Sequence, residues 1–256
     1  MRVIKIGGAI IDSPHLRERV LTAIARTDEP CVLVHGGGVV ATRLARQLNV
    51  PQTIVDGRRV TDAATLEIVV MAYAGNVNKT LVAELHAMGR PSIGVTGADA
   101  DLVRAHRREH PTLDFGFVGD VDHVNSAQLR TLLDQGLGVV VAPITHDGAG
   151  QLLNTNADTM AADIAIALAK SSVSGDEPVS LHFVFEQHGV LTSIDDPSSV
   201  IPVVCAADVA GLIERGVITK GMMPKITNAV RAAEAGATVV IQHADDCGTM
   251  KGTRVI

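Results

Sequence analysis

Val3-Ile4-Lys5-Ile6-Gly7-Gly8 is the stretch of sequence that decides the fold. Apolar, strand-forming residues lead up to Lys5 and two glycines follow it, which is typical of a buried strand that ends in a tight turn. Short apolar runs of similar composition recur along the chain, at Cys31–Val34, Ser92–Val95, Gly138–Ala142, Leu181–Phe185 and Thr238–Ile241. Several of these runs lack an alternation of apolar and polar residues, so we expect strands that are buried on both faces.

Segments with helical spacing lie between the expected strands. Apolar residues recur every three or four positions over 40–48 and again over 66–85. Thr61-Asp62 is a suitable start for the longer helix, and Gly89 is a suitable end. Buried strands separated by helices predict an α/β fold, a three-layer αβα sandwich around a mainly parallel central sheet.

The tract Ser171–Pro178 is the most linker-like part of the chain, because serine, glycine, proline and acidic residues gather there. We therefore expect two lobes, one of residues 1–170 and one of residues 171–256. Within the first lobe, the polar region from about Ala105 to Val124 carries Phe115-Gly116-Phe117-Val118-Gly119-Asp120-Val121, which favours a hairpin or a lid.

Composition argues against several classes of function. The net charge of -6 disfavours nucleic acid or an anionic membrane as a partner. No apolar run approaches the roughly 20 residues that span a bilayer. The cysteines Cys31, Cys205 and Cys247 form no C-x-x-C pair, so we expect neither a disulfide framework nor structural zinc. The chain begins without the long apolar region of a signal peptide, which indicates a cytoplasmic protein.

Two glycine-rich turns follow expected strands, at Lys5-Ile6-Gly7-Gly8 and at His35-Gly36-Gly37-Gly38. The second turn opens a helix, so backbone N–H groups and the positive end of the helix dipole are available to an anion. Neither turn has the G-x-G-x-x-G or Walker A pattern, which disfavours a dinucleotide oxidoreductase and a P-loop enzyme. Two glycine turns suggest two separate anionic groups.

Three further motifs carry polar side chains toward expected helix starts. Of the pair Arg58-Arg59, one guanidinium suits a carboxylate and the other favours solubility. Asn154, Asn156 and Asp158 occupy alternate positions, which in an extended segment would aim all three to one side; the alternative is that they are helix caps. Gly221-Met222-Met223-Pro224-Lys225 places a lysine after a glycine turn.

Together these motifs resemble the amino acid kinase family, and within it the acetylglutamate kinase subfamily of arginine biosynthesis. The resemblance covers nearly the whole chain and rests on K-x-G-G at Lys5, H-G-G-G at His35, G-x-R-V-T at 57–61, N-x-N-A-D at 154–158, G-M-x-P-K at 221–225 and Gly252-Thr253-Arg254-Val255. It implies ATP-dependent phosphorylation of the γ-carboxylate of N-acetyl-L-glutamate, with ATP and Mg²⁺ as cofactors. It also implies an acylglutamate-binding and dimerising N-terminal lobe and an ATP-binding C-terminal lobe.

The resemblance also implies roles for particular residues. Lys5 and Lys225 would stabilise the transferring phosphoryl group, and Asp158 would orient both lysines. The acylated amino acid would bind at Gly37, Gly38, Arg59, Asn154 and Asn156. ATP would bind at Gly7, Gly8, Phe185, Gly189, Thr219 and Gly221. No metal site built from side chains is expected.

The sequence departs from the family pattern at two places near the expected nucleotide site. Phe185-Glu186-Gln187-His188-Gly189 replaces the usual S-D-V-x-G, and Lys220 replaces an acidic residue. The segment 115–121 resembles a subgroup whose substrate carries an N-succinyl group. His106-Arg107-Arg108-Glu109-His110 formally matches a metallopeptidase pattern, but Pro111 and the charged surroundings favour a solvated segment.

The alternatives that stay open are an N-succinyl-L-glutamate kinase, a carbamate or aspartate kinase of the same fold, and a catalytically silent amino acid sensor. Arginine-inhibited members of the resembled family carry an additional N-terminal helix, whereas the first strand here begins at Arg2. We therefore expect a homodimer that is insensitive to arginine.

Overall fold

A computed structural model of the chain describes residues 1–55, 57–172, 178–219 and 221–256. Its described residues form an eight-stranded central sheet with the order β12-β14-β13-β11-β1-β2-β8-β5. The strands are β1 (Arg2–Ile6), β2 (Cys31–His35), β5 (Ser92–Thr96), β8 (Gly138–Ala142), β11 (Ser180–Phe185), β12 (Val203–Val204), β13 (Thr238–His243) and β14 (Thr253–Val255). Neighbouring strands are parallel except for the antiparallel pair of β13 and β14.

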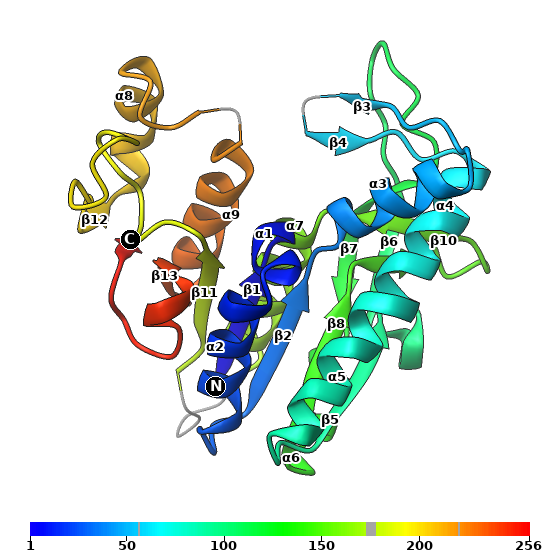
Figure 1. Ribbon diagram of the computed structural model, residues 1–256, viewed down its shortest axis with the longest axis horizontal. Coiled ribbons are helices and arrows are strands. Elements are labelled where there is room, and N and C mark those ends of the chain that lie inside the picture. Colours follow the sequence, from blue (N-terminus) through cyan, green and yellow to red (C-terminus); the bar gives the residue numbers. More distant parts are fainter. Residues whose placement is uncertain (56, 173–177, 220) are drawn as a thin grey trace.

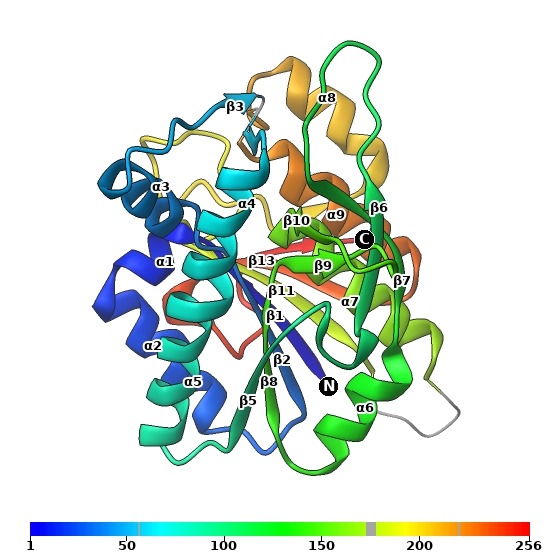
Figure 2. The ribbon, with the colours of Figure 1, turned by 90° about the vertical axis from the view of Figure 1, so that its right-hand side faces the viewer.

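Helices cover both faces of this sheet, because successive strand residues point into two different hydrophobic cores. Val3 and Phe183 belong to one core, whereas Ile4 and Val184 belong to the other. The first core contains residues from α6 (Ser126–Asp134), α7 (Ala157–Lys170), α8 (Val209–Glu214) and α9 (Met223–Glu234). The second contains residues from α1 (Gly8–Asp12), α2 (Pro14–Ala25), α3 (Gly38–Gln47), α4 (Ala63–Val70) and α5 (Asn78–Ala87). Figures 1 and 2 show the resulting three layers. The predicted αβα sandwich with a mainly parallel central sheet is therefore confirmed.

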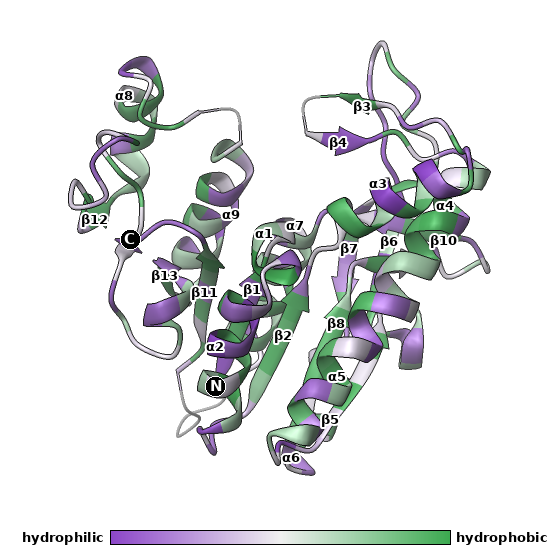
Figure 3. Ribbon diagram, viewed as in Figure 1, coloured by the Kyte–Doolittle hydropathy of each residue, from purple (hydrophilic) through white to green (hydrophobic). Residues whose placement is uncertain are grey.

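The strands that the sequence predicted are the apolar ones. The six expected strands all lie in the central sheet, where the ribbon is largely hydrophobic (Figure 3). A four-stranded closed barrel was not predicted; it consists of β6 (Val103–Arg107), β7 (Val118–Val124), β9 (Ile144–His146) and β10 (Leu152–Thr155). These strands are short and partly polar, so they carry a weak sequence signal. The expected hairpin before residue 124 is confirmed by the antiparallel pairing of β6 with β7.

The expected long helix extends from Ala63 to Ala87, but it is not a regular α-helix throughout. Asp62 caps its start by accepting a hydrogen bond from the Thr65 amide, and Gly89, with φ 82°, follows its end. Between α4 and α5 lies a π-helical segment, η1 (Met71–Val77), which the sequence did not predict. Short 3₁₀ segments lie at η2 (Asp99–Asp101), η3 (Ala206–Asp208) and η4 (Ala244–Asp246). A separate two-stranded antiparallel sheet is formed by β3 (Ile54–Val55) and β4 (Arg58–Arg59).

The strand order reverses at β1, β2 and β11. Strand β1 lies between β2, which follows it in the chain, and β11, which comes after α7. Ligands of open α/β sheets bind where the strand order reverses in this way. The sheet continues from β1 to β11 across the expected lobe junction, so the division at residue 171 stays a prediction; residues 173–177 of the expected linker lie outside the described residues. Among the described helices, none has the length and apolar character needed to cross a bilayer.

Candidate active site

Lys5 and Lys225 meet at the carboxylate of Asp158. Lys5 is the penultimate residue of β1, and its Nζ lies 2.7 Å from Oδ1 of Asp158. Lys225 lies in the first turn of α9, and its Nζ lies 3.8 Å from Oδ2 of the same carboxylate. Lys5 and Asp158 are buried, whereas Lys225 keeps 20% of its side chain exposed. Residues from the two ends of the chain therefore place two ammonium groups on one buried anion.

The protonation of this triad follows from opposing effects. Burial raises the pKa of Asp158, but the charges of Lys5 and Lys225 and their hydrogen bonds outweigh it, so the pKa of this carboxyl lies below its usual value. Burial lowers the pKa of the Lys225 ammonium, and the charge of Lys5 acts in the same direction, while Asp158 and Glu186 oppose the shift. Asp158 is accordingly an ionised bridge between two cations.

Asn154, Asn156 and Asp158 do not form the extended segment that their alternation suggested. Strand β10 ends at Thr155 and α7 begins at Ala157, so Asp158 already lies in the helix. Asn156 is the helix cap, since its Oδ1 accepts hydrogen bonds from the amides of Asp158 and Thr159. The expectation of an extended segment was wrong at its last residue, and the alternative of helix capping applies to Asn156.

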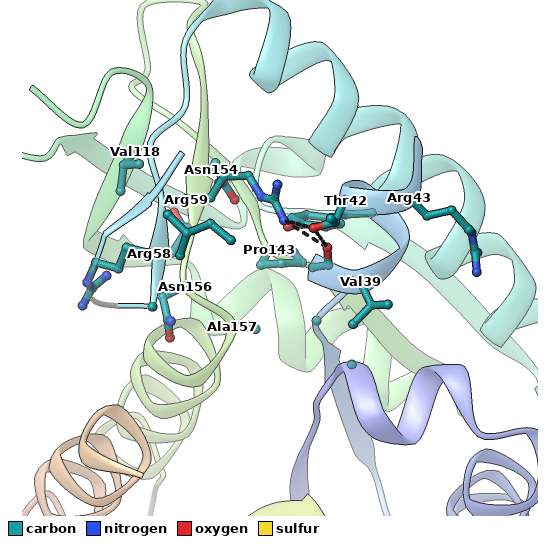
Figure 4. Close-up of a pocket in the computed structure, with 18 of the residues that line it drawn as sticks. Val39, Thr42, Arg43, Arg58, Arg59, Val118, Pro143, Asn154, Asn156 and Ala157 are labelled. Carbon is teal, nitrogen blue, oxygen red and sulfur yellow. Dashed lines mark hydrogen bonds between the residues drawn. The ribbon is translucent and has the colours of Figure 1, made fainter. Parts of the chain in front are cut away.

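Five of the expected substrate residues line one cavity of about 820 Å³, namely Gly37, Gly38, Arg59, Asn154 and Asn156. The cavity also contains Gly8, Arg58, Tyr73, Val118 and Pro143 among its lining residues. Figure 4 shows Asn154 and Arg59 close together on one side, with Asn156 and Ala157 at the start of α7. The structure therefore brings together residues that are far apart in the sequence.

Arg59 is held rigidly at this cavity. Its Nη2 donates to the carbonyl of Gly38 at 3.0 Å and to Oγ1 of Thr42 at 2.9 Å, and its Nη1 donates to Oε1 of Gln52 (Figure 4). Only 9% of the residue is exposed. A guanidinium fixed in this way has its remaining donors oriented for an anion.

Tyr73 is a lining residue that sequence reasoning missed. It lies in η1, is buried, and packs its ring against Gly37. It is the one tyrosine of the sequence. A lone aromatic residue on a helix predicts core packing as readily as a binding site, so only the structure assigns it to the cavity.

The residues expected at the nucleotide are more dispersed. Gly8 lines the cavity, and Gly7 precedes α1 close to the Lys5 ammonium. Phe185 ends β11 and is buried. Thr219 and Gly221 both precede α9, and Lys220 lies outside the described residues. A Cβ on Gly189 would come within 2.6 Å of Oγ1 of Thr253, so close packing accounts for this glycine. The nucleotide assignments stay predictions.

The described residues contain no group of three or more His, Cys, Asp or Glu side chains arranged to hold a metal ion. Within the H-x-x-E-H pattern, His106 lies in β6 and contacts Asp122, while His110 packs edge-on against Phe115. The two histidines therefore have other partners.

Comparison with known proteins agrees with this geometry. The model of the amino acid kinase family matches residues 1–243, and the chain belongs to this family. A curated protein of Parabacteroides distasonis named acetylglutamate kinase is 46% identical over 99% of this chain and 98% of its own length. An acetylglutamate kinase of Cytophaga hutchinsonii is 45% identical over 93% of this chain and 89% of its own length.

Solved structures show the same architecture. The smu.665 protein of Streptococcus mutans has a TM-score of 0.81 and 29% identity, covering 99% of this chain and 97% of that chain. Giardia carbamate kinase has a TM-score of 0.68 at 13% identity, covering 100% of this chain and 98% of that chain, which shows a shared fold alone.

Proposed function

We propose that this protein is an ATP-dependent kinase that phosphorylates the γ-carboxylate of N-acetyl-L-glutamate in arginine biosynthesis. The convergence of Lys5 and Lys225 on Asp158 carries the proposal, since two cations next to a cavity lined by arginines suit phosphoryl transfer between two anions. The names of the curated relatives support the choice of acceptor.

The chemistry requires positioning and charge neutralisation. A carboxylate has an ordinary pKa of about 4, so it is already ionised near neutral pH and needs no general base before it attacks phosphorus. Repulsion between the acceptor and ATP is the main obstacle. Lys5 and Lys225 neutralise the charge that spreads over the phosphoryl oxygens, and Asp158 holds the two ammonium groups in place.

The cavity provides the acceptor site. Arg59 and Asn154 bind the acylated amino acid through its carboxylate and amide groups, and the amides of Gly37 and Gly38 face the reacting end. Asn154 is oriented for this, because its Nδ2 donates to Oγ1 of Thr61 at 3.0 Å, leaving the amide oxygen for a ligand N–H.

The nucleotide binds along the carboxyl ends of the central strands, at Gly7, Gly8, Phe185, Gly189, Thr219 and Gly221. Mg²⁺ bound with ATP would supply further neutralisation of the phosphate charge. Asp158 already pairs with two ammonium groups, so this ion would be held mainly by oxygens of ATP.

N-succinyl-L-glutamate is the second candidate acceptor, and the charge of the cavity favours it. Arg43, Arg46, Arg58 and Arg59 all line the cavity, whereas the lining residues include no aspartate or glutamate among those described. Figure 4 shows Arg43 pointing away from Asn154. An acyl group with a carboxylate of its own would find an additional guanidinium at Arg58.

Hydroxylamine trapping of the acyl phosphate product tests both candidates. The purified protein is incubated with Mg-ATP and with N-acetyl-, N-succinyl- or unmodified glutamate, and hydroxamate is measured beside ADP release. Hydroxamate from N-acetylglutamate supports the proposal, and a higher rate with N-succinylglutamate selects the second candidate. Absence of both hydroxamate and ADP with every acceptor would contradict the proposal and favour a carbamate or aspartate kinase or an amino acid sensor.

We further propose a cytoplasmic homodimer. Light scattering tests the assembly, since two chains of 26.8 kDa predict twice that mass. A monomer or a hexamer in solution would contradict it.

A further inference from the structure

A chain of polar groups, which is buried at His35 and Asn78, lies behind the His35-Gly36-Gly37-Gly38 turn. Nζ of Lys79 lies 2.7 Å from the Gly94 carbonyl and 3.0 Å from Oδ1 of Asn78. Nδ2 of Asn78 lies 3.2 Å from Nε2 of His35, and Nδ1 of His35 lies 2.7 Å from the carbonyl of Gly36. His35 is 0% exposed and Asn78 is 1% exposed.

The partners of this chain determine its protons. A carbonyl oxygen only accepts, so Nδ1 of His35 carries the hydrogen that is donated to Gly36. Nε2 then accepts one hydrogen of the Asn78 amide, and the other is donated to the carbonyl of Val140 at 2.9 Å. Burial lowers the pKa of His35 to about 4, so the imidazole is neutral near pH 7.

The π-helical segment places Asn78 in this position. The Asn78 amide donates to the carbonyl of Tyr73, five residues earlier, which is the bond pattern of a π-helix. In a regular α-helix of 3.6 residues per turn, residues five apart point about 140° away from each other. The π segment instead allows Tyr73 to contact Gly37 while Asn78 contacts His35.

Gly36 is anchored through both of its backbone polar groups. Its amide donates to the carbonyl of Ile6 at 2.9 Å, and its carbonyl accepts from His35. The carbonyl of Gly36 and the amide of Gly37 belong to one trans peptide and point in opposite directions. With the carbonyl directed at the buried histidine, the Gly37 N–H points away from it, and Gly37 lines the cavity.

We propose that His35 and Asn78 are positioning residues, which orient the Gly36–Gly37 peptide so that the Gly37 N–H is presented to the transferring phosphoryl group. This role rests on the proposed kinase function. The two side chains act through the backbone of the turn and do not touch the substrate. A preorganised N–H donor contributes most when charge develops in the transition state, so disturbing it lowers kcat more than it raises KM.

The charged group that acts on His35 among the described residues is Lys79 from α5, which adds to the lowering of its pKa. The neighbouring position on β1 is the apolar Ile6, η1 presents Tyr73, and β8 presents the Val140 carbonyl. Titration of His35 therefore does not enter the wild-type kcat profile between pH 6 and 9.

Asn78→Asp tests the proposal through a new pH dependence. A carboxylate at this position attracts a proton to the aspartate–histidine pair. With that proton bound, the pair still donates from Nδ1 of His35 to Gly36. Once it is lost, the remaining imidazole hydrogen moves to Nε2 to face the carboxylate, and the Gly36 carbonyl loses its donor.

We expect kcat of Asn78→Asp to fall by about tenfold or more as pH rises between 6 and 9, as for loss of one preorganised donor. Asn76→Asp is the matched control, because Asn76 is exposed on the same long helix and the substitution adds an equal charge. The dependence of kcat on pH in this variant should follow that of the wild type. A folded Asn78→Asp protein with the wild-type profile would overturn the proposal.

A second pair of variants covers the case in which Asn78→Asp fails to fold. The amide nitrogen of an asparagine lies near the place of Nδ1 in histidine, so His35→Asn retains a donor for Gly36 and His35→Leu does not. The proposal requires a kcat at least about tenfold higher in His35→Asn than in His35→Leu. Equal kcat values would contradict it.

The tautomer of His35 gives a readout that does not depend on activity. ¹⁵N-detected imidazole spectra of the wild-type protein should show the Nδ1–H form at pH 7. An Nε2–H form or an imidazolium would overturn the hydrogen-bond assignment. If the tautomer is as expected but no acceptor is phosphorylated, the proposed function fails while the buried chain of hydrogen bonds stands.

Discussion

The ring of Tyr73 occupies the space into which a side chain on Gly37 would extend. A Cβ on Gly37 would lie 2.5 Å from Cδ1 and 2.9 Å from Cε1 of this ring. Contacts this short require the ring or the glycine turn to move. The π-helical segment and the glycine turn therefore depend on each other for their shape.

Gly37→Ala should lower the free energy of unfolding by about 1–3 kcal/mol, as overpacking of a buried site does. The loss should be smaller by at least about 0.5 kcal/mol in a Tyr73→Val background, because valine lacks the two ring carbons that collide. Urea unfolding of the four proteins in this cycle measures the coupling. Gly38→Ala is the control, since its Cβ would meet Nη2 of Arg59 at 3.9 Å, an ordinary contact. Additive effects of Gly37→Ala and Tyr73→Val would contradict the expected collision.

Lys5→Ala and Lys225→Ala should each lower kcat by roughly 10²–10³-fold, because each removes a cation that neutralises charge in the transition state. Steady-state kinetics with N-acetylglutamate and ATP measure the effect, and circular dichroism checks the fold. Lys170→Ala is a matched control at the exposed end of α7. Turnover of either motif variant at the level of Lys170→Ala would exclude a catalytic role for that lysine.

Asp158→Asn should lower the free energy of unfolding at pH 7 by about 3–5 kcal/mol, since it leaves the buried ammonium of Lys5 without its counterion. The folded pKa of Asp158 lies below the value of about 3.9 for an unfolded aspartate. Its contribution to stability is therefore complete above about pH 4 and is lost as pH falls through the folded pKa.

Chemical denaturation of wild type and Asp158→Asn at several pH values checks this dependence. The difference between the two proteins should be constant from pH 7 down to about pH 5 and shrink below pH 4. Asp134→Asn, in the last turn of α6 and exposed, serves as the control for an ordinary surface carboxylate. A difference that grows toward acid would show that Asp158 is not stabilised in its ionised form.

Arg59→Ala should raise KM for the acyl amino acid by about 10–100-fold, as expected for the loss of hydrogen bonds from a charged group. KM for ATP should change much less. Arg59→Lys keeps the charge but loses the fork that contacts Gly38 and Thr42, so it should be intermediate. Equal increases in both KM values would count against a role in acceptor binding.

Much of the fold could be predicted from the amino-acid sequence. The strands that contain Lys5, His35 and Phe185 consist of apolar runs buried on both faces, and such runs predict a parallel sheet between helices. The strands of the small barrel were missed because a few residues that alternate weakly carry little periodic signal. Asp158 was placed in an extended segment because the alternation of polar residues continues past the start of α7.

The residues of the site also fall into two groups, those that the sequence indicated and those that only the structure revealed. Motifs next to glycines and helix starts singled out Lys5, Arg59 and Lys225, because glycine turns and unpaired helix amides have a local sequence signature. The roles of these residues were implied by the resemblance of the motifs to the amino acid kinase family. Tyr73 and Asn78 have no such signature. Their contacts with Gly37 and His35 depend on a π-helical segment that the sequence did not predict.

The sequence by itself determined the α/β architecture and the kinds of group available for phosphoryl transfer, because burial periodicity and turn chemistry are local properties of the chain. Only the tertiary structure decided which groups meet. Strand order carries Lys5 and Lys225 to the same carboxylate, and the helix register carries Asn78 to His35. Such meetings depend on the summed packing of two cores, which no short segment encodes.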